Sequence, residues 1–194
     1  MTRFGLAWLL LLLALPAQAQ EVARIEGQAG QLASGRMALN QAAGAGNAQA
    51  NQMALAWSES GIGQADAQAA QTVTPGDRAR SAQAGIDGGA FHGVQGVLSI
   101  NQVAGSGNAQ ANLFVVDQGA MPAWLVDDTA LAQAVGAPPA EGAGTPPTAA
   151  REARIDAGAF SGSTGVIQVN QGAGVGNAAT NAIVLHLPLQ GGTP

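Results

Sequence analysis

Three segments of the chain have the form Ala-Gly-x-Gly-Asn, and the backbone N–H groups of such glycine-rich turns can cradle a phosphate group. A phosphate-binding loop also needs a Lys followed by Ser or Thr, and the chain contains no Lys. A dinucleotide-binding turn needs a third Gly or Ala where the first two copies have Gln49 and Gln110. Because the pattern also occurs three times, it indicates a repeated structural turn rather than a phosphate site.

Few side chains have the types and spacing of a catalytic or metal site. His92 has Asp87 nearby and could act as a general base, but the corresponding position of a later copy is Ser161. Asp127 and Asp128 could ligate Ca²⁺, yet two adjacent carboxylates supply too few oxygen ligands, and a solvated helix start is favoured. We therefore expect no enzymatic activity, no metal and no cofactor.

Trp57 and Trp124 lie where a repeated unit meets the segment that follows it. An indole ring can form a stacking platform for a carbohydrate, but packing at the boundary is the favoured interpretation.

The composition excludes several classes of partner. Seven basic residues against twelve acidic ones give a net charge of -5, which argues against a sequence-independent grip on nucleic acid or anionic lipid. The absence of Cys removes thiolate chemistry and disulfides, and two His are too few for a zinc cluster. Much of the apolar content is Ala, which buries little area, so a large core is not expected.

The first 19 residues have the pattern of a secretory signal peptide. Arg3 precedes an apolar run from Phe4 to Leu15, and the small residues Ala17 and Ala19 flank the expected cleavage site. The run is shorter than the roughly 20 apolar residues that span a bilayer, so stable membrane insertion is not expected.

The remainder is organised by three copies of one unit that share the core N-Q-x-A-G-x-G-N-A-x-x-N. We place the repeats at residues 25–56, 86–117 and 155–187, separated by spacers at 57–85 and 118–154 and followed by a tail at 188–194. Within each unit apolar residues alternate with small or polar ones, as Leu98 and Ile100 do around Ser99, which is typical of β-strands. The two glycines interrupt this pattern, so each unit is predicted to be strand, turn, strand.

A single strand-turn-strand unit is marginal in water, so the copies must stack. Stacking in register places repeated side-chain amides above one another, where they can form hydrogen-bonded ladders. The expected fold is all-β, a short β-solenoid or cross-β stack with looped-out spacers. The expected ladder residues are Asn40, Gln41, Asn47, Gln49, Asn51, Asn101, Gln102, Asn108, Gln110, Asn112, Asn170, Gln171, Asn177 and Asn181, and the turn glycines are Gly44, Gly46, Gly105, Gly107, Gly174 and Gly176.

In-register stacking has a further electrostatic consequence. An acidic residue opens each unit (Glu26, Asp87 and Asp156), so these carboxylates should lie one layer apart, with Arg24 and Arg154 offsetting part of their repulsion. In the spacers, prolines and glycines at 136–147 disfavour a buried strand. A short helix is expected at 128–135, and the Ala- and Gln-rich segment 64–71 is a weaker helix candidate.

The repeated motif, with two unequal spacers behind a signal peptide, resembles the Fap-type functional amyloids of bacterial biofilms and is similar in logic to the curlins. The family's motif positions map onto the ladder and turn residues above, with Ala179 where the other two units have Gln. The family's major subunit typically carries a cysteine pair near its C-terminus, which this chain lacks, so both major and minor or nucleating subunit stay open.

The resemblance implies an exported structural protein that assembles into extracellular cross-β fibrils for biofilm matrix and adhesion. Its expected partners are further copies of itself, related fibril subunits and outer-membrane export machinery, with a transient stay in the periplasm. A monomeric β-solenoid adhesin on the cell surface and a periplasmic fibril-assembly factor are the alternatives.

Overall fold

The structure is a computed structural model that describes residues 20–59, 63–74, 76, 78–119, 133–136 and 149–188. The expected signal peptide and most of the expected tail lie outside these residues. Every regular element in the described part of the chain is a β-strand, which confirms the expected all-β class.

Nine of the strands form three groups of three that recur along the chain. We refer to residues 20–57, 81–119 and 151–188 as repeats 1, 2 and 3. Repeat 1 comprises β1 (Gln20–Ile25), β2 (Ser34–Ala43) and β3 (Ala48–Trp57), repeat 2 comprises β5 (Ser81–Ile86), β6 (Gln95–Ala104) and β7 (Ala109–Gly119), and repeat 3 comprises β9 (Arg151–Ile155), β10 (Thr164–Ala173) and β11 (Ala178–Pro188).

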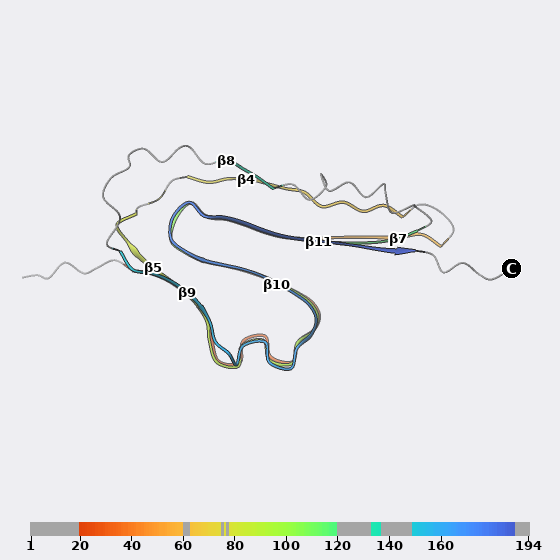
Figure 1. Cartoon of the computed structure of the whole chain (residues 1–194), viewed down its shortest axis with the longest axis horizontal. Coiled ribbons are helices and arrows are strands. Elements are labelled where there is room, and N and C mark those ends of the chain that lie inside the picture. The colour runs from red at the N-terminus through yellow and green to blue at the C-terminus, as the bar shows by residue number, and fades with distance from the viewer. Residues whose placement is uncertain are drawn as a thin grey trace, which may run out of the picture.

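These nine strands form three sheets, each with one strand from each repeat, and all pairings are parallel. Sheet A has the order β1-β5-β9, sheet B β10-β6-β2 and sheet C β11-β7-β3, so repeat 2 is always in the middle. The register joins equivalent residues, for example Asn40 with Asn101 and Asn101 with Asn170. Viewed down the shortest axis, the repeats follow nearly the same S-shaped path and overlie one another (Figure 1).

The sheets form layers that are joined through their alternating faces. Leu98 and Ile100 of sheet B pack with Ile86 of sheet A in one apolar cluster. The opposite face of sheet B meets sheet C through amides, and Asn101 donates a hydrogen bond to the backbone oxygen of Ala50. Alternation of side chains along a strand therefore gives sheet B one apolar and one amide-rich interface.

A strand precedes each unit that the motif predicts. β1, β5 and β9 carry Ala23 and Ile25, or their equivalents, at alternate positions, and in repeats 1 and 2 these residues are buried. The period-two pattern was present in the sequence, but it is short and built largely from Ala. The motif alone therefore does not reveal that sheet A exists.

The turns between the first and second strands of each repeat differ in one aromatic side chain. Phe91 and Phe160 stack with their ring centroids 5.4 Å apart, while repeat 1 has Gly30 at the corresponding position. A Cβ at Gly30 would lie 2.5 Å from the Phe91 ring, so glycine leaves the space that this ring fills. Repeat 1 therefore has no aromatic ring at this position, and the ring of Phe91 from repeat 2 occupies the space beside Gly30.

The spacers do not simply loop out as expected. β4 (Ala69–Thr72) from the first spacer pairs in parallel with β8 (Gln133–Gly136) from the second, forming sheet D. Ala67 and Ala69 pack against Leu113 and Val115 of sheet C, because that apolar face would otherwise be open to water.

Both helix expectations in the spacers change accordingly. Residues 69–71, part of the weaker candidate at 64–71, are strand, and residues 133–135 of the expected helix at 128–135 belong to β8. The start of that helix, residues 128–132, lies outside the described residues. In the described part, no helix is long and apolar enough to cross a membrane.

Candidate self-assembly ladders

Two columns of asparagine lie face to face between sheets B and C. Asn101 Nδ2 lies 3.0 Å from Asn40 Oδ1, and Asn170 Nδ2 lies 3.0 Å from Asn101 Oδ1. Asn112 Nδ2 lies 2.8 Å from Asn51 Oδ1 and 3.0 Å from Asn101 Oδ1, so the columns are also joined across the interface. Asn181 continues the second column with a 3.0 Å bond to Asn112.

The same amides satisfy backbone carbonyls at the centre of the molecule. Asn101 donates to the oxygen of Ala50 at 2.8 Å, and Asn112 donates to that of Ile100 at 3.0 Å. Asn101 and Asn112 are both fully buried. Because a buried polar group without a partner costs about 1–3 kcal/mol, the ladder must be complete to be stable.

A glutamine column joins sheet B to sheet A. Gln171 donates to Gln102 Oε1 and Gln102 to Gln41 Oε1, both at 2.8 Å. Each of these amides also donates to a sheet A carbonyl, and Gln102 reaches the oxygen of Gly85 at 2.8 Å. The motif's Asn-Gln pair thus serves both faces of sheet B, with Asn toward sheet C and Gln toward sheet A.

The turn carries a fourth column of amides, and the second arm begins a fifth. Asn177 donates to Asn108 Oδ1 and Asn108 to Asn47 Oδ1, each at 2.9 Å. Gln49 donates to Gln110 Oε1 at 2.9 Å, but the repeat 3 position of that column is Ala179. The Gln49–Gln110 column therefore ends within the chain, as the departure from the motif predicts.

The turn glycines permit the close approach of successive turns. Gly105 has a φ of 116°, and a Cβ there would lie 1.7 Å from the carbonyl oxygen of Gly174. Gly44 has a φ of 108°, and its Cβ would lie 2.2 Å from the oxygen of Gly105. No L side chain fits these positions, so both the turn and the layer spacing require glycine.

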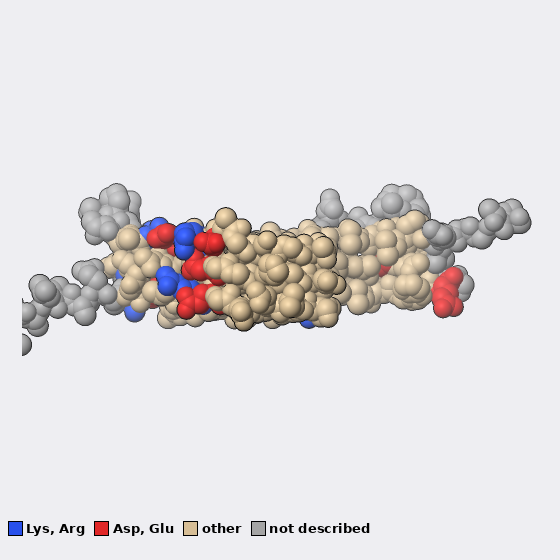
Figure 2. Space-filling model, turned by 90° about the horizontal axis from the view of Figure 1, so that it is seen from below, with Lys and Arg blue, Asp and Glu red and all other residues tan. Residues whose placement is uncertain are grey.

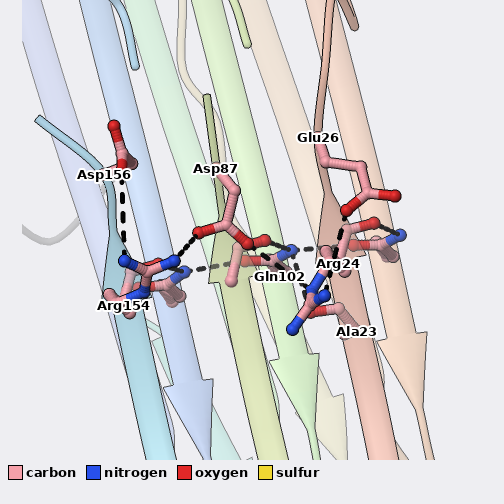
Figure 3. A network of polar contacts seen from close by, with 10 residues as sticks. Ala23, Arg24, Glu26, Asp87, Gln102, Arg154 and Asp156 are labelled. Carbon is pink, nitrogen blue, oxygen red and sulfur yellow. Dashed lines mark hydrogen bonds and ion pairs between the residues drawn. The ribbon is translucent and has the colours of Figure 1, made fainter. Parts of the chain in front are cut away.

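The acidic residue that opens each unit lies in a network with two arginines on sheet A (Figure 3). Arg24 Nε lies 3.5 Å from Asp87 Oδ2, and Arg154 pairs with the other oxygen of the same carboxylate. The register aligns both arginines with Gly85 of repeat 2, where a side chain would meet Asp87 at 2.9 Å. Asp87 therefore lies between two guanidinium groups, as the expected charge compensation requires.

A further polar contact between repeats, not expected from the sequence, joins His186 and Asp117. His186 of repeat 3 is in register with Asp117 of repeat 2, and its Nδ1 contacts the Asp117 carboxylate. Asp117 is 4% exposed. The signal was present, because the two residues are equivalent positions once the repeats are aligned.

The remaining candidates for chemistry do not gather into a site. The described residues contain no group of three or more His, Cys, Asp or Glu that could hold a metal. Trp57 is 74% exposed, so the expected packing at the repeat boundary is wrong for this residue. Trp124, Asp127 and Asp128 lie outside the described residues.

Comparison with known proteins places the whole repeat region in one family. No solved structure matches the chain. The model of the functional amyloid protein FapB/FapC family matches residues 13–188, which include all three repeats and both spacers. This is a family of structural amyloid proteins rather than enzymes. The chain belongs to the functional amyloid protein FapB/FapC family.

Proposed function

We propose that the chain is an exported structural subunit that assembles into extracellular cross-β fibrils. The observation that carries the proposal is the arrangement of the strands of repeats 1 and 3. Within the chain, sheets A, B and C each end in a strand from these repeats that pairs on one side. Unpaired edge strands are templates for another chain, and in sheet B the two edge strands, β2 and β10, have the same length and pair with β6 in the same register.

The ladders give the two ends complementary chemistry. In the columns of Asn40, Gln41 and Asn51, each amide nitrogen of repeats 2 and 3 bonds to the oxygen of the preceding repeat. The next acceptors in these columns are the side-chain oxygens of repeat 3, and the next donors are the NH₂ groups of repeat 1. Repeat 1 of one copy therefore fits repeat 3 of another, head to tail.

On this proposal the three repeats form a short β-solenoid with open ends, and every added copy extends sheets A, B and C by three strands. The amide columns would then continue through the fibril, which makes the ladder residues the self-assembly residues. Residues 1–19 direct the chain out of the cytoplasm, and outer-membrane export machinery completes secretion. The fibrils serve biofilm matrix and adhesion, with this chain as the major subunit or as a minor, nucleating one.

The experiment is to incubate the purified chain from Gln20 onward at tens of micromolar and record X-ray fibre diffraction. The proposal predicts fibres with a strong reflection near 4.7 Å along the fibre axis, and fragments that seed fresh soluble chain. A chain that stays monomeric for days contradicts the proposal and supports a surface adhesin. A chain that stays soluble but retards another Fap subunit's polymerisation supports an assembly factor.

A further inference from the structure

Part of sheet C has a face that sheet B does not cover. At its beginning sheet B bends toward sheet A, while sheet C runs on in the same direction (Figure 1). Residues two apart along a strand share a face. The side chains that follow Asn112 at every second position of sheet C therefore point to the same side as Asn112, which faces sheet B. Beyond the bend these side chains have no layer of sheet B opposite them.

The uncovered face carries an apolar strip, which we define as Leu55, Trp57, Val116, Gln118, Leu185 and Leu187. The register places Leu55, Val116 and Leu185 in one column, and Trp57, Gln118 and Leu187 in the next. Leu55 is 66% exposed and Leu185 is 41% exposed, and Val116 of the middle repeat is also partly exposed. The strip therefore faces solvent along all three repeats and not only at the two ends.

Exposed apolar side chains are concentrated here. Of the eight large apolar side chains that are exposed in the described part of the chain, four belong to the strip. Seen from below, the charged side chains gather mainly at the end of the molecule near sheet A, and most of the half formed by sheet C is free of them (Figure 2). The strip is therefore an uncharged surface on which exposed apolar side chains are grouped.

The size of the strip limits what can occupy it. Three layers spaced ~4.8 Å apart and two side-chain columns give an area on the order of 200 Å² per chain. A stable interface buries about 800 Å² on each partner, so the strip of one chain is too small to hold a partner. The strip runs along the direction in which the layers stack, so it becomes continuous when copies are added.

We propose that the apolar strip pairs with the same strip of a second stack of this chain, so that each fibril consists of two stacks side by side. The pairing rests on the proposed fibril assembly. A second stack has the same layer spacing, so its side chains meet those of the first at every layer, as in a dry interface between paired sheets. Multivalency lets contacts that are too weak between single chains hold two long stacks together.

The test measures mass per length of unstained fibrils by scanning transmission electron microscopy. A single stack adds one chain every ~14 Å, which is three layer spacings, and a pair adds two chains over the same length. The wild-type chain should give the value for two chains. The triple variant Leu55→Thr, Val116→Thr and Leu185→Thr places uncharged residues of high strand propensity at all three positions and should give half of it.

A matched control is Val22→Thr, which removes an apolar side chain that is 45% exposed on the outer face of sheet A. This variant should keep two chains per ~14 Å. Wild-type fibrils with one chain per ~14 Å would overturn the pairing and leave fibril assembly intact, as when a lipid surface or another protein occupies the strip. A triple variant that keeps two chains would also overturn it, because another face would hold the stacks together. Wild-type chain that forms no fibrils refutes the proposed function itself.

Discussion

At the scale of single residues, the buried amides decide whether the three repeats form one structure. Asn101 is fully buried and lies within hydrogen-bond distance of Asn40, Asn112 and Asn170 and of one backbone carbonyl. In a low-dielectric interior such a network stabilises only when every member has a partner. The hydrogen bonds of the central amide therefore contribute more to stability than the apolar area that a side chain buries at this position.

Replacing Asn101 with Leu should destabilise the unassembled chain by about 3 kcal/mol or more, because several buried polar groups lose their partner at once. The same change at Asn40, which is exposed at the end of the same column, should cost about 1 kcal/mol. Urea unfolding, at protein concentrations too low for assembly, measures the loss of stability in both variants. Equal losses would show that the column contributes no more in the middle of the chain than at its end.

The sequence predicts which amides share a column, because the repeats align without gaps through the motif. It does not predict that Gln102 reaches across to Gly85 or that Asn101 reaches Ala50. Those contacts depend on how the sheets are layered. Layering is set by where the chain bends between strands, and the turn sequences do not encode those angles in a simple pattern.

At the scale of elements, the turns set the spacing of the layers. Gly105 and Gly176 both have positive φ, but they differ in what surrounds them. A Cβ at Gly105 would lie 1.7 Å from a carbonyl oxygen of the next layer, whereas nothing lies within 4 Å of a Cβ at Gly176. Gly105 therefore differs from Gly176 both in the contact with the next layer and in its larger φ, 116° against 73°.

Gly176→Ala should lower the free energy of unfolding by about 1 kcal/mol, because the positive φ strains the alanine backbone and the added Cβ meets no neighbour. Gly105→Ala should cost roughly 3–5 kcal/mol, since overpacking against the next turn is added to the strain. Urea midpoints of the two variants, compared at constant slope, give the difference. Similar losses at both sites would mean that the turns tolerate a wider layer spacing than the structure has.

The spacers were the least predictable elements. The Ala- and Gln-rich segment of the first spacer has weak periodicity, so neither helix nor strand is favoured locally. It becomes strand because its alanines at 67 and 69 cover the apolar face of Leu113 and Val115. This is a tertiary effect, and it overrides local propensity.

The role of β4 can be tested by substituting two neighbouring alanines. Ala69 is 4% exposed and faces sheet C, while Ala70 is exposed on the other side of the strand. Ala69→Asn should lower stability by about 1–3 kcal/mol and speed hydrogen exchange across residues 63–74, because it buries an amide against apolar side chains. Ala70→Asn should leave both nearly unchanged. Equally fast exchange in the wild-type chain would mean that the spacer does not dock.

At the scale of the whole molecule, the central claim is that the layers of one copy continue into the next. The chain contains no Cys, so a pair of introduced cysteines reports directly on distance. Ser34 of repeat 1 and Thr164 of repeat 3 are both in register with Gln95 of repeat 2. Within one chain they are therefore two layers apart, roughly 9.6 Å, beyond the ~7 Å limit between Cα atoms for a disulfide.

In a head-to-tail fibril the same two positions lie in adjacent layers of neighbouring copies, ~4.8 Å apart, which a disulfide can span. Fibrils of the Ser34→Cys, Thr164→Cys variant are assembled under reducing conditions, oxidised, dissolved in denaturant and run on a non-reducing gel. The control variant, Ser34→Cys with Gln95→Cys, should give monomers with an internal disulfide. The account predicts a ladder of long covalent oligomers from the first variant, and monomers or nothing larger than dimers would contradict it.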